Sequence, residues 1–148
     1  MNLAEQKATG PEAQIRAAIE DWSGALRAKD AKRVVAHHAP NYVQFSLAPP
    51  LISDAAVAEG LEAWFATWQG PLRHEVRDLS ILASADTAFC HGLARLGGTK
   101  TGGEKPDIWF RLTLGLRKVG GAWKIVHEHE SVPFYMDGSY KAAVDLKP

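Results

Sequence analysis

The chain has 148 residues, which suits one domain with one hydrophobic core, and 46% of the residues are apolar. Lysine and arginine together number 17, as do aspartate and glutamate, so the charge balance argues against a nucleic-acid-binding surface. The single cysteine, Cys90, excludes an internal disulfide framework. The N-terminus has no apolar signal segment and no run approaches 18 apolar residues, so we expect a cytoplasmic protein without a membrane partner.

The first part of the chain is predicted to be mainly helical. We interpret residues 1–8 as a loose tail. Pro11 indicates the start of a long amphipathic helix, because proline suits the first turn, and apolar residues follow at helical spacing. Asp30 can cap a second, short helix over residues 31–38, which Pro40 stops.

A short strand and a third helix are predicted next. Residues 42–45 form the strand, and the prolines at 49 and 50 exclude a central strand directly after it. Ser53 or Asp54 caps the third helix, and residues 70–71, Gly-Pro, end it. The apolar stripe of this helix consists of Val57, Leu61, Trp64, Phe65 and Trp68.

The rest of the chain is predicted to form strands. They cover residues 73–82 and 87–96, followed by a hairpin from residue 107, with turns at 85–86 and 97–103. This order of elements predicts an α+β domain with a cone-shaped, strongly curved and mostly antiparallel sheet, whose concave face is covered by the three N-terminal helices. Such an architecture leaves a conical cavity, which is the natural place for a ligand.

The hairpin over residues 107–134 carries most of the functional interpretation. Two alternating runs flank Gly120 and Gly121, which is a strong β-hairpin signal. Pairing of Lys118 with Trp123 would place directly opposed residues on one face. The apolar face would then hold Ile108, Phe110, Leu112, Leu114, Leu116, Trp123 and Ile125, and would continue at its far end with His127, His129 and Ser131.

The opposite face of this hairpin is predicted to be polar. A loop with a bulge would slip the register by one residue and place Arg111 beside His129, so the register decides which polar groups meet. In the regular register the opposite face carries Trp109, Arg111, Thr113, Arg117, Lys124, Glu128 and Glu130.

His127 and His129 are the candidate catalytic pair, because strand periodicity places both on one face. They could supply a general base and a polarising donor, they could be buried packing residues, or they could bind a metal if His91 on a neighbouring strand were a third ligand. Arg111 would face Glu130, either as an ion pair at the sheet surface or as a clamp for a carboxylate or enolate oxygen of the substrate.

Aromatic residues are the candidate lining of the pocket, although most of them also suit a core. Trp64 and Trp68 are four residues apart, so we expect both on one face of the third helix, as pocket walls. Trp22, Tyr42, Phe45 and Trp109 complete the aromatic set.

Four segments carry a resemblance to a known family: residues 38–41 (His-Ala-Pro-Asn), 47–51, 107–113 and above all 127–134. From Ala13 onward the chain resembles a SnoaL-like, ketosteroid-isomerase-like domain of the nuclear-transport-factor-2-like superfamily. The last segment is also similar to the association domain of calcium/calmodulin-dependent kinase.

The resemblance implies an α+β cone, a homodimer packed through the sheet, and a hydrophobic pocket with few polar groups. His38 stands where the family usually has tyrosine, and we expect it to point inward as a further ligand-binding residue. Asn41 and Ser46 stand where the family usually has carboxylates, so a carboxylate base is not expected at those two positions.

Two functions follow as hypotheses. One is a cofactor-free isomerase, cyclase or dehydratase that transfers a proton on a hydrophobic carbonyl compound, with His127 or His129 as the base and Arg111 or the second histidine stabilising the enolate. The other is a non-catalytic module of the same fold for ligand binding, dimerisation or association. In both, the expected partner is a small hydrophobic ligand, and neither a cofactor nor a metal is expected.

Overall fold

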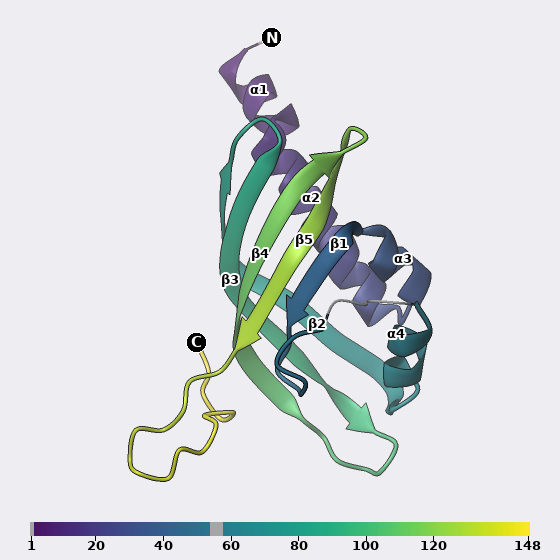
Figure 1. Cartoon of the computed structure of the whole chain (residues 1–148), viewed down its shortest axis with the longest axis vertical. Helices are drawn as coiled ribbons and strands as arrows, with labels where there is room; N and C mark the ends of the chain where they lie inside the picture. Colours follow the sequence, from purple (N-terminus) through teal and green to yellow (C-terminus); the bar gives the residue numbers. More distant parts are fainter. Residues whose placement is uncertain (1, 54–57) are drawn as a thin grey trace.

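The structure is a computed structural model that describes residues 2–53 and 58–148 of the chain. Figure 1 shows a curved sheet with helices on one side and a loop near the C-terminus that extends from the body. None of the helices in these ranges is both long and apolar enough to cross a membrane. The helices are α1 (Leu3–Thr9), α2 (Pro11–Arg27), α3 (Ala31–Ala36) and α4 (Ala58–Phe65). The strands are β1 (His38–Phe45), β2 (Trp68–Ala83), β3 (Thr87–Lys100), β4 (Asp107–Val119) and β5 (Ala122–Ser131).

The five strands form one sheet in the order β1-β5-β4-β3-β2. β1 runs parallel to β5, and the other neighbours are antiparallel. The predicted α+β class, with a curved and mostly antiparallel sheet, is therefore confirmed. β2 and β3 are longer than predicted, and the turn expected over residues 97–103 is confined to residues 101–103.

The predicted loose tail is wrong for most of its length, because residues Leu3–Thr9 form α1. A capping box starts this helix: the Asn2 side chain accepts from Glu5 N at 2.9 Å, and Asn2 N donates to Glu5 Oε2 at 2.8 Å. Asparagine followed three residues later by glutamate is the sequence signature of this motif. The long helix predicted from Pro11 is confirmed as α2.

Helix α2 packs its apolar stripe against β2 and β5. The stripe follows the predicted helical spacing, and Ile15, Ile19 and Trp22 on it are buried. Trp123 Nε1 on β5 donates to Gln14 Oε1 at 3.1 Å, which satisfies the buried indole. This helix therefore fixes one wall of the space above the sheet.

The second predicted helix is confirmed with its cap, since the Asp30 side chain accepts from Arg33 N at 3.1 Å. It ends earlier than expected, at Ala36, and His38 belongs to β1. The reason is that Ile125 N donates to His37 O at 2.8 Å, so sheet pairing takes over the chain before Pro40.

The third helix is confirmed as α4, but Trp68 begins β2 instead of ending this helix. The Gly-Pro pair that was expected to end the helix lies inside β2 at a register shift, where Gly70 has a φ of +71° that suits glycine. Asp54, one of the two predicted caps, and Val57 lie outside the described residues. Ser53 exchanges two backbone hydrogen bonds with Gln44, at 2.7 and 2.9 Å.

The β4–β5 hairpin begins in the predicted register, with Lys118 opposite Trp123 and positive φ angles at Gly120 and Gly121. The register then shifts. Ile125 pairs with Leu116, but the next residue of β4, Gly115, pairs with His127, so Val126 has no partner on β4. Val126 is a β-bulge, and it reverses the face of every later β5 residue relative to the regular ladder.

Candidate functional site

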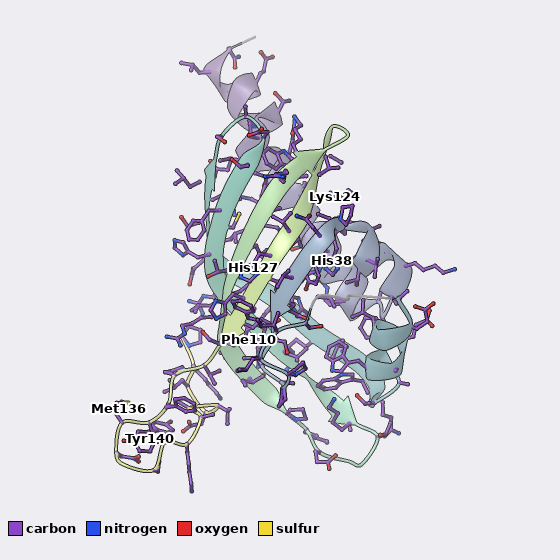
Figure 2. The ribbon with its side chains drawn as sticks, viewed as in Figure 1. His38, Phe110, Lys124, His127, Met136 and Tyr140 are labelled. Carbon is purple, nitrogen blue, oxygen red and sulfur yellow. The ribbon has the colours of Figure 1, made fainter. Side chains whose placement is uncertain are left out.

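A cavity of about 380 Å³ lies between the sheet and helices α2, α3 and α4. Its floor includes Phe110 of β4 and Leu96 of β3, and Figure 2 labels Phe110 together with His38 of β1. Apolar side chains from the three helices close the other side: Trp22, Leu26, Val34, Leu61 and Trp64. The volume suits a small organic ligand.

Two carboxyl groups enter this cavity from β5. After the bulge, Glu128 lies opposite Leu114 and Glu130 lies opposite Leu112, so both acids share the inner face with buried leucines. Glu128 is only 4% exposed, whereas Glu130 is half-buried and its Oε2 accepts from Leu47 N at 3.4 Å. The site therefore holds acidic groups in an otherwise largely apolar space.

The two carboxyls differ in how readily they hold a proton. Burial raises the pKa of Glu128, although hydrogen bonds from Glu130, Tyr42 and Gln44 oppose this. Burial, and then the neighbouring Glu128 charge, raise the pKa of Glu130 well above its ordinary value. Two carboxyls that close together in an apolar site do not ionise together easily, and Glu130, whose pKa is raised more, is the one that keeps its proton to higher pH.

Tyr42 of β1 positions Glu128. Its hydroxyl donates to Glu128 Oε2 at 2.5 Å. Burial, and then the Glu128 charge, raise the pKa of Tyr42, so the phenol stays protonated and acts as a donor. The Tyr42 ring stacks on His38, with centroids 3.9 Å apart and planes 5° apart.

His38 brings unpaired polar atoms to the cavity wall. Neither of its ring nitrogens has a hydrogen-bond partner among the described residues, and the same holds for the indole nitrogen of Trp22. Burial lowers the pKa of His38 to about 4, with a smaller contribution from His37, so the imidazole is neutral near pH 7. A neutral imidazole offers one donor and one acceptor, and both nitrogens are buried without a partner among the described residues.

The predicted catalytic residues lie elsewhere. His127 and His129 alternate with the two cavity carboxyls along β5, and both rings meet the edge of Phe45, at centroid distances of 4.7 and 5.3 Å. His127 Nδ1 is 2.8 Å from Val43 O. The prediction that these histidines face the pocket is wrong, because the Val126 bulge turns them to the other side of the sheet.

Arg111 is also outside the cavity. It lies opposite Ser131, and its Nε donates to Ser131 Oγ at 3.1 Å, so the predicted Arg111–Glu130 pair is wrong for the same reason. Ser131 was also expected on the inner face, but like the two histidines it lies on the outer face of the sheet. The catalytic roles predicted for His127, His129 and Arg111 find no support in this placement.

The predicted ligand-binding residues divide into two groups. Tyr42, Trp64 and His38 line the cavity as expected. Phe45 lies against the two outer histidines instead, and Trp68 is buried behind Trp64, in an edge contact at 5.8 Å.

Trp109 also departs from the prediction that it lines the pocket. It precedes the cavity residue Phe110 on β4, so it points to the opposite face, where the Arg95 guanidinium carbon lies 5.6 Å from its ring centroid.

Sequence reasoning missed several cavity residues. Glu128 and Glu130 were assigned to the outer face, and Ser46 was considered only as a missing carboxylate, yet it lines the cavity. His74 of β2 was not considered, although the alternation of Leu72, His74 and Val76 places it on an apolar face. That alternation was the one signal in the sequence that pointed to His74.

The described residues contain no group of three or more histidine, cysteine, aspartate or glutamate side chains that could hold a metal ion. His91, the conditional third ligand for His127 and His129, lies opposite Thr113 on β4, and Thr113 in turn lies opposite His129. A whole strand thus separates His91 from the β5 histidines.

Comparisons with known proteins agree with this architecture. The sequence profile of the SnoaL-like domain matches residues 15–135. An NTF2-like protein of unknown function from Pseudomonas putida is 34% identical, with a TM-score of 0.80, over 93% of this chain and 96% of that one. No curated protein matches the chain in sequence.

Two more distant structures share the fold. A ketosteroid isomerase-like protein from Erwinia carotovora atroseptica is 23% identical, with a TM-score of 0.66, over 80% of this chain and 93% of that one. A nuclear transport factor 2-like superfamily protein from Salmonella enterica serovar Typhimurium is 14% identical, with a TM-score of 0.74, over 87% and 95%. Since the profile match covers most of the chain, and the sheet, helices and cavity follow the expected architecture, the chain belongs to the SnoaL-like domain family, within the NTF2-like fold.

Proposed function

We propose that the cavity binds a small hydrophobic carbonyl compound and that the Glu128–Glu130 pair transfers a proton on it without a cofactor. One observation carries this proposal: two neighbouring carboxyl groups, whose pKa values are both raised by burial, lie at one end of an apolar cavity. Acid and base are then present together, each tuned toward neutral pH by burial.

The chemistry requires one base and one donor. Glu128, as the carboxylate, accepts a proton from the carbon next to the substrate carbonyl, and the electron pair of the broken C–H bond moves to the carbonyl oxygen. Glu130, as the acid, turns its single O–H from Glu128 to that oxygen and donates a hydrogen bond to it while its charge develops. Return of the proton to another carbon gives an isomer, and loss of a neighbouring hydroxyl as water gives dehydration.

Tyr42 and the apolar walls support this assignment. The hydrogen bond from Tyr42 holds Glu128 in place and partly offsets the cost of its burial. Exclusion of water strengthens the electrostatic interactions between the carboxyl pair and the substrate. A protein of the same fold, from Erwinia, is described as ketosteroid isomerase-like, which is consistent with the proposed proton transfer.

Deuterium exchange tests the proposal directly. We expect wild-type protein in D₂O to catalyse exchange at the carbon next to the carbonyl of 1-tetralone, followed by proton NMR. Glu128→Gln should lower the rate by about 100-fold or more, the usual range for loss of a general base. His129→Ala separates the two assignments: loss of exchange there, with an unaffected Glu128→Gln, would return the role of base to the histidine and refute the carboxyl mechanism.

A binding module without turnover is a second candidate, and the mostly apolar lining of the cavity favours it, together with Asn41 and Ser46 at positions where the family usually has carboxylates. This candidate predicts that 1-tetralone raises the melting temperature without exchange above the buffer rate, whereas exchange by the wild type excludes it.

Self-association belongs to the same proposal. We expect a homodimer packed through the outer face of the sheet, where Trp109 and Thr113 are half-buried, and sedimentation velocity measures the mass directly. Thr113→Arg should shift the protein toward monomer, because a charge without a partner would be buried at the interface. The cytoplasmic location stays a prediction from the sequence.

A further inference from the structure

His74 brings another polar group to the cavity, from β2 at the opposite edge of the sheet. It lies on β2, is 4% exposed, and lines the cavity. Two strands separate β2 from β5, so the sheet spans about 14 Å between them at roughly 4.8 Å per strand, less where it curls. Between them the floor of the cavity is formed by the apolar residues Phe110 and Leu96. The cavity therefore has two polar ends and an apolar central part.

A network behind His74 determines which ring nitrogen carries the proton. Arg27 Nη1 donates to Ser23 Oγ at 3.1 Å and to His74 O at 2.8 Å. Because a guanidinium only donates, the Ser23 hydroxyl accepts from Arg27 and keeps its own proton to give. Its shortest contact is His74 Nδ1, at 2.7 Å, whereas His74 O is 3.3 Å away and already accepts from Arg27.

A neutral imidazole that accepts at Nδ1 carries its proton on Nε2. The ring stays neutral near pH 7, because burial and then the Arg27 charge lower the pKa of His74 to about 4. His74 is thus a hydrogen-bond donor of fixed tautomer, and Ser23 and Arg27 are the residues that position it.

The charges around the cavity define the ligand further. Its ionisable lining consists of the carboxyls of Glu128 and Glu130, the phenol of Tyr42 and the imidazoles of His38 and His74, and no lysine or arginine is among the described lining residues. An anionic ligand would find no cation to pair with, and would meet the Glu128 carboxylate. The lining therefore favours an uncharged ligand.

We propose that His74 is a second ligand-binding residue, whose Nε2–H holds an oxygen at the end of the ligand remote from the Glu128–Glu130 pair. The substrate class is then an uncharged compound with two oxygen functions, a carbonyl at the carboxyl pair and a hydroxyl, ether or second carbonyl at His74. For the carbonyl end of the ligand this inference rests on the proposed function, and it adds the contact between His74 and an oxygen at the opposite end.

Paired ligands test the remote end. By calorimetry, wild-type protein should bind 6-(4-hydroxyphenyl)-1-tetralone, whose oxygens lie farther apart than those of a single tetralone ring system, about fivefold more tightly than 6-phenyl-1-tetralone, the size of one net hydrogen bond. His74→Phe should bind the two compounds equally, and Glu130→Gln should weaken both by the same factor and keep the ratio. The analogue with a carboxylate in place of the hydroxyl should bind more weakly than 6-phenyl-1-tetralone.

The outcomes separate the two proposals. An unchanged ratio in His74→Phe overturns the role of His74, whatever the exchange experiment gives. A ratio that depends on His74, without any exchange, keeps this inference and removes the catalytic proposal. Tighter binding of the carboxylate analogue, or binding of neither tetralone to the wild type, overturns the substrate class.

The tautomer supplies a readout that needs no ligand. Nitrogen-15 NMR at pH 7 should show His74 with a protonated Nε2 and an unprotonated Nδ1, and Ser23→Ala should move it toward a mixture of tautomers. This milder variant also covers the case in which His74→Phe fails to fold. A protonated Nδ1 in the wild type contradicts the inference.

Discussion

The Tyr42 hydroxyl donates to Glu128 Oε2 at 2.5 Å, and the two residues reach each other from adjacent strands, β1 and β5. This contact joins the element that precedes the cavity to the last strand of the sheet. It fixes the phenol as a donor and favours the charged form of Glu128, whereas Glu130 keeps its proton to higher pH. Much of the behaviour expected of the cavity follows from these three groups.

Tyr42→Phe removes this donor while it keeps the ring that stacks on His38. The buried Glu128 carboxylate then loses a hydrogen bond, so we expect the free energy of unfolding to fall by about 2 kcal/mol at pH 7, as for hydrogen bonds to charged groups. Urea titration measures the change. Tyr140→Phe, at an exposed phenol, is the matched control and should have no effect. Equal stability of wild type and Tyr42→Phe would show that the contact is not formed in solution.

Glu130→Gln should make stability less dependent on pH on the alkaline side. A carboxyl whose pKa is raised by folding contributes its full stability below its ordinary pKa of 4.5, and loses it as the pH rises through the folded value. Wild-type protein should therefore lose stability between pH 5 and pH 9, and the variant should lose less.

Unfolding free energies at pH 5, 7 and 9 provide the comparison for Glu130→Gln. Glu62→Gln, at an exposed position of α4, should keep the wild-type slope. If Glu130→Gln and the wild type gave parallel curves, Glu130 would not hold its proton to higher pH over this range.

His38→Phe should reduce the loss of stability in acid. Folding lowers the pKa of His38 from 6.5 to about 4, so below pH 6.5 the unfolded chain binds this proton more readily, and stability falls until about pH 4. The shift corresponds to at most about 3 kcal/mol. His74 has a similar shift, so the variant should remove only part of the acid-side loss.

Melting temperatures between pH 4 and pH 7 measure this effect of His38. Phenylalanine retains the stacking on Tyr42 and leaves no unpaired nitrogen, so stability at pH 7 should not decrease. His91→Phe, at an exposed histidine, is the matched control. A wild-type acid profile in His38→Phe would mean that His38 is already hydrated or protonated in the folded protein.

Sequence patterns were sufficient to predict those helices and turns that depend only on residues close together in the chain. The helical spacing along α2, the Asp30 cap and the pair Gly120-Gly121 each determine an element without help from distant residues. The fold class followed from the order of these elements. The capping box of α1 shows that another local signal, Asn2 with Glu5, was present in the sequence and was not used.

The site was predictable only in part, because its composition depends on a single unpaired residue. Alternation along β5 gives the correct faces up to Ile125, and Val126 reverses them afterwards. Nothing in the sequence around Val126 distinguishes a bulge from a regular ladder position, so the histidines were placed inside and the carboxyls outside. Tyr42 and Trp64 line the cavity as expected because they lie on elements whose inward direction does not depend on this register, and His38 lines it from β1, not from the end of the predicted helix.

Deletion of Val126 tests this explanation. Ile125 and His127 already occupy successive ladder positions opposite Leu116 and Gly115, so removal of Val126 should close the bulge and leave Glu128 facing the cavity. We expect a folded protein, destabilised by about 1 to 2 kcal/mol, that keeps the alkaline-side dependence on Glu130.

Deletion of Lys124 is the matched control, because it removes a residue that is paired with Arg117. Ile125, which is buried, would have to take that place on the outer face, and Val126 would move opposite Leu116, so this deletion exposes an isoleucine and leaves a smaller side chain in the core, and it should cost more than the deletion of Val126. Circular dichroism and urea titration distinguish the two deletions. Equal damage from both would mean that Val126 is held in the ladder, and that the inward direction of Glu128 and Glu130 has another cause.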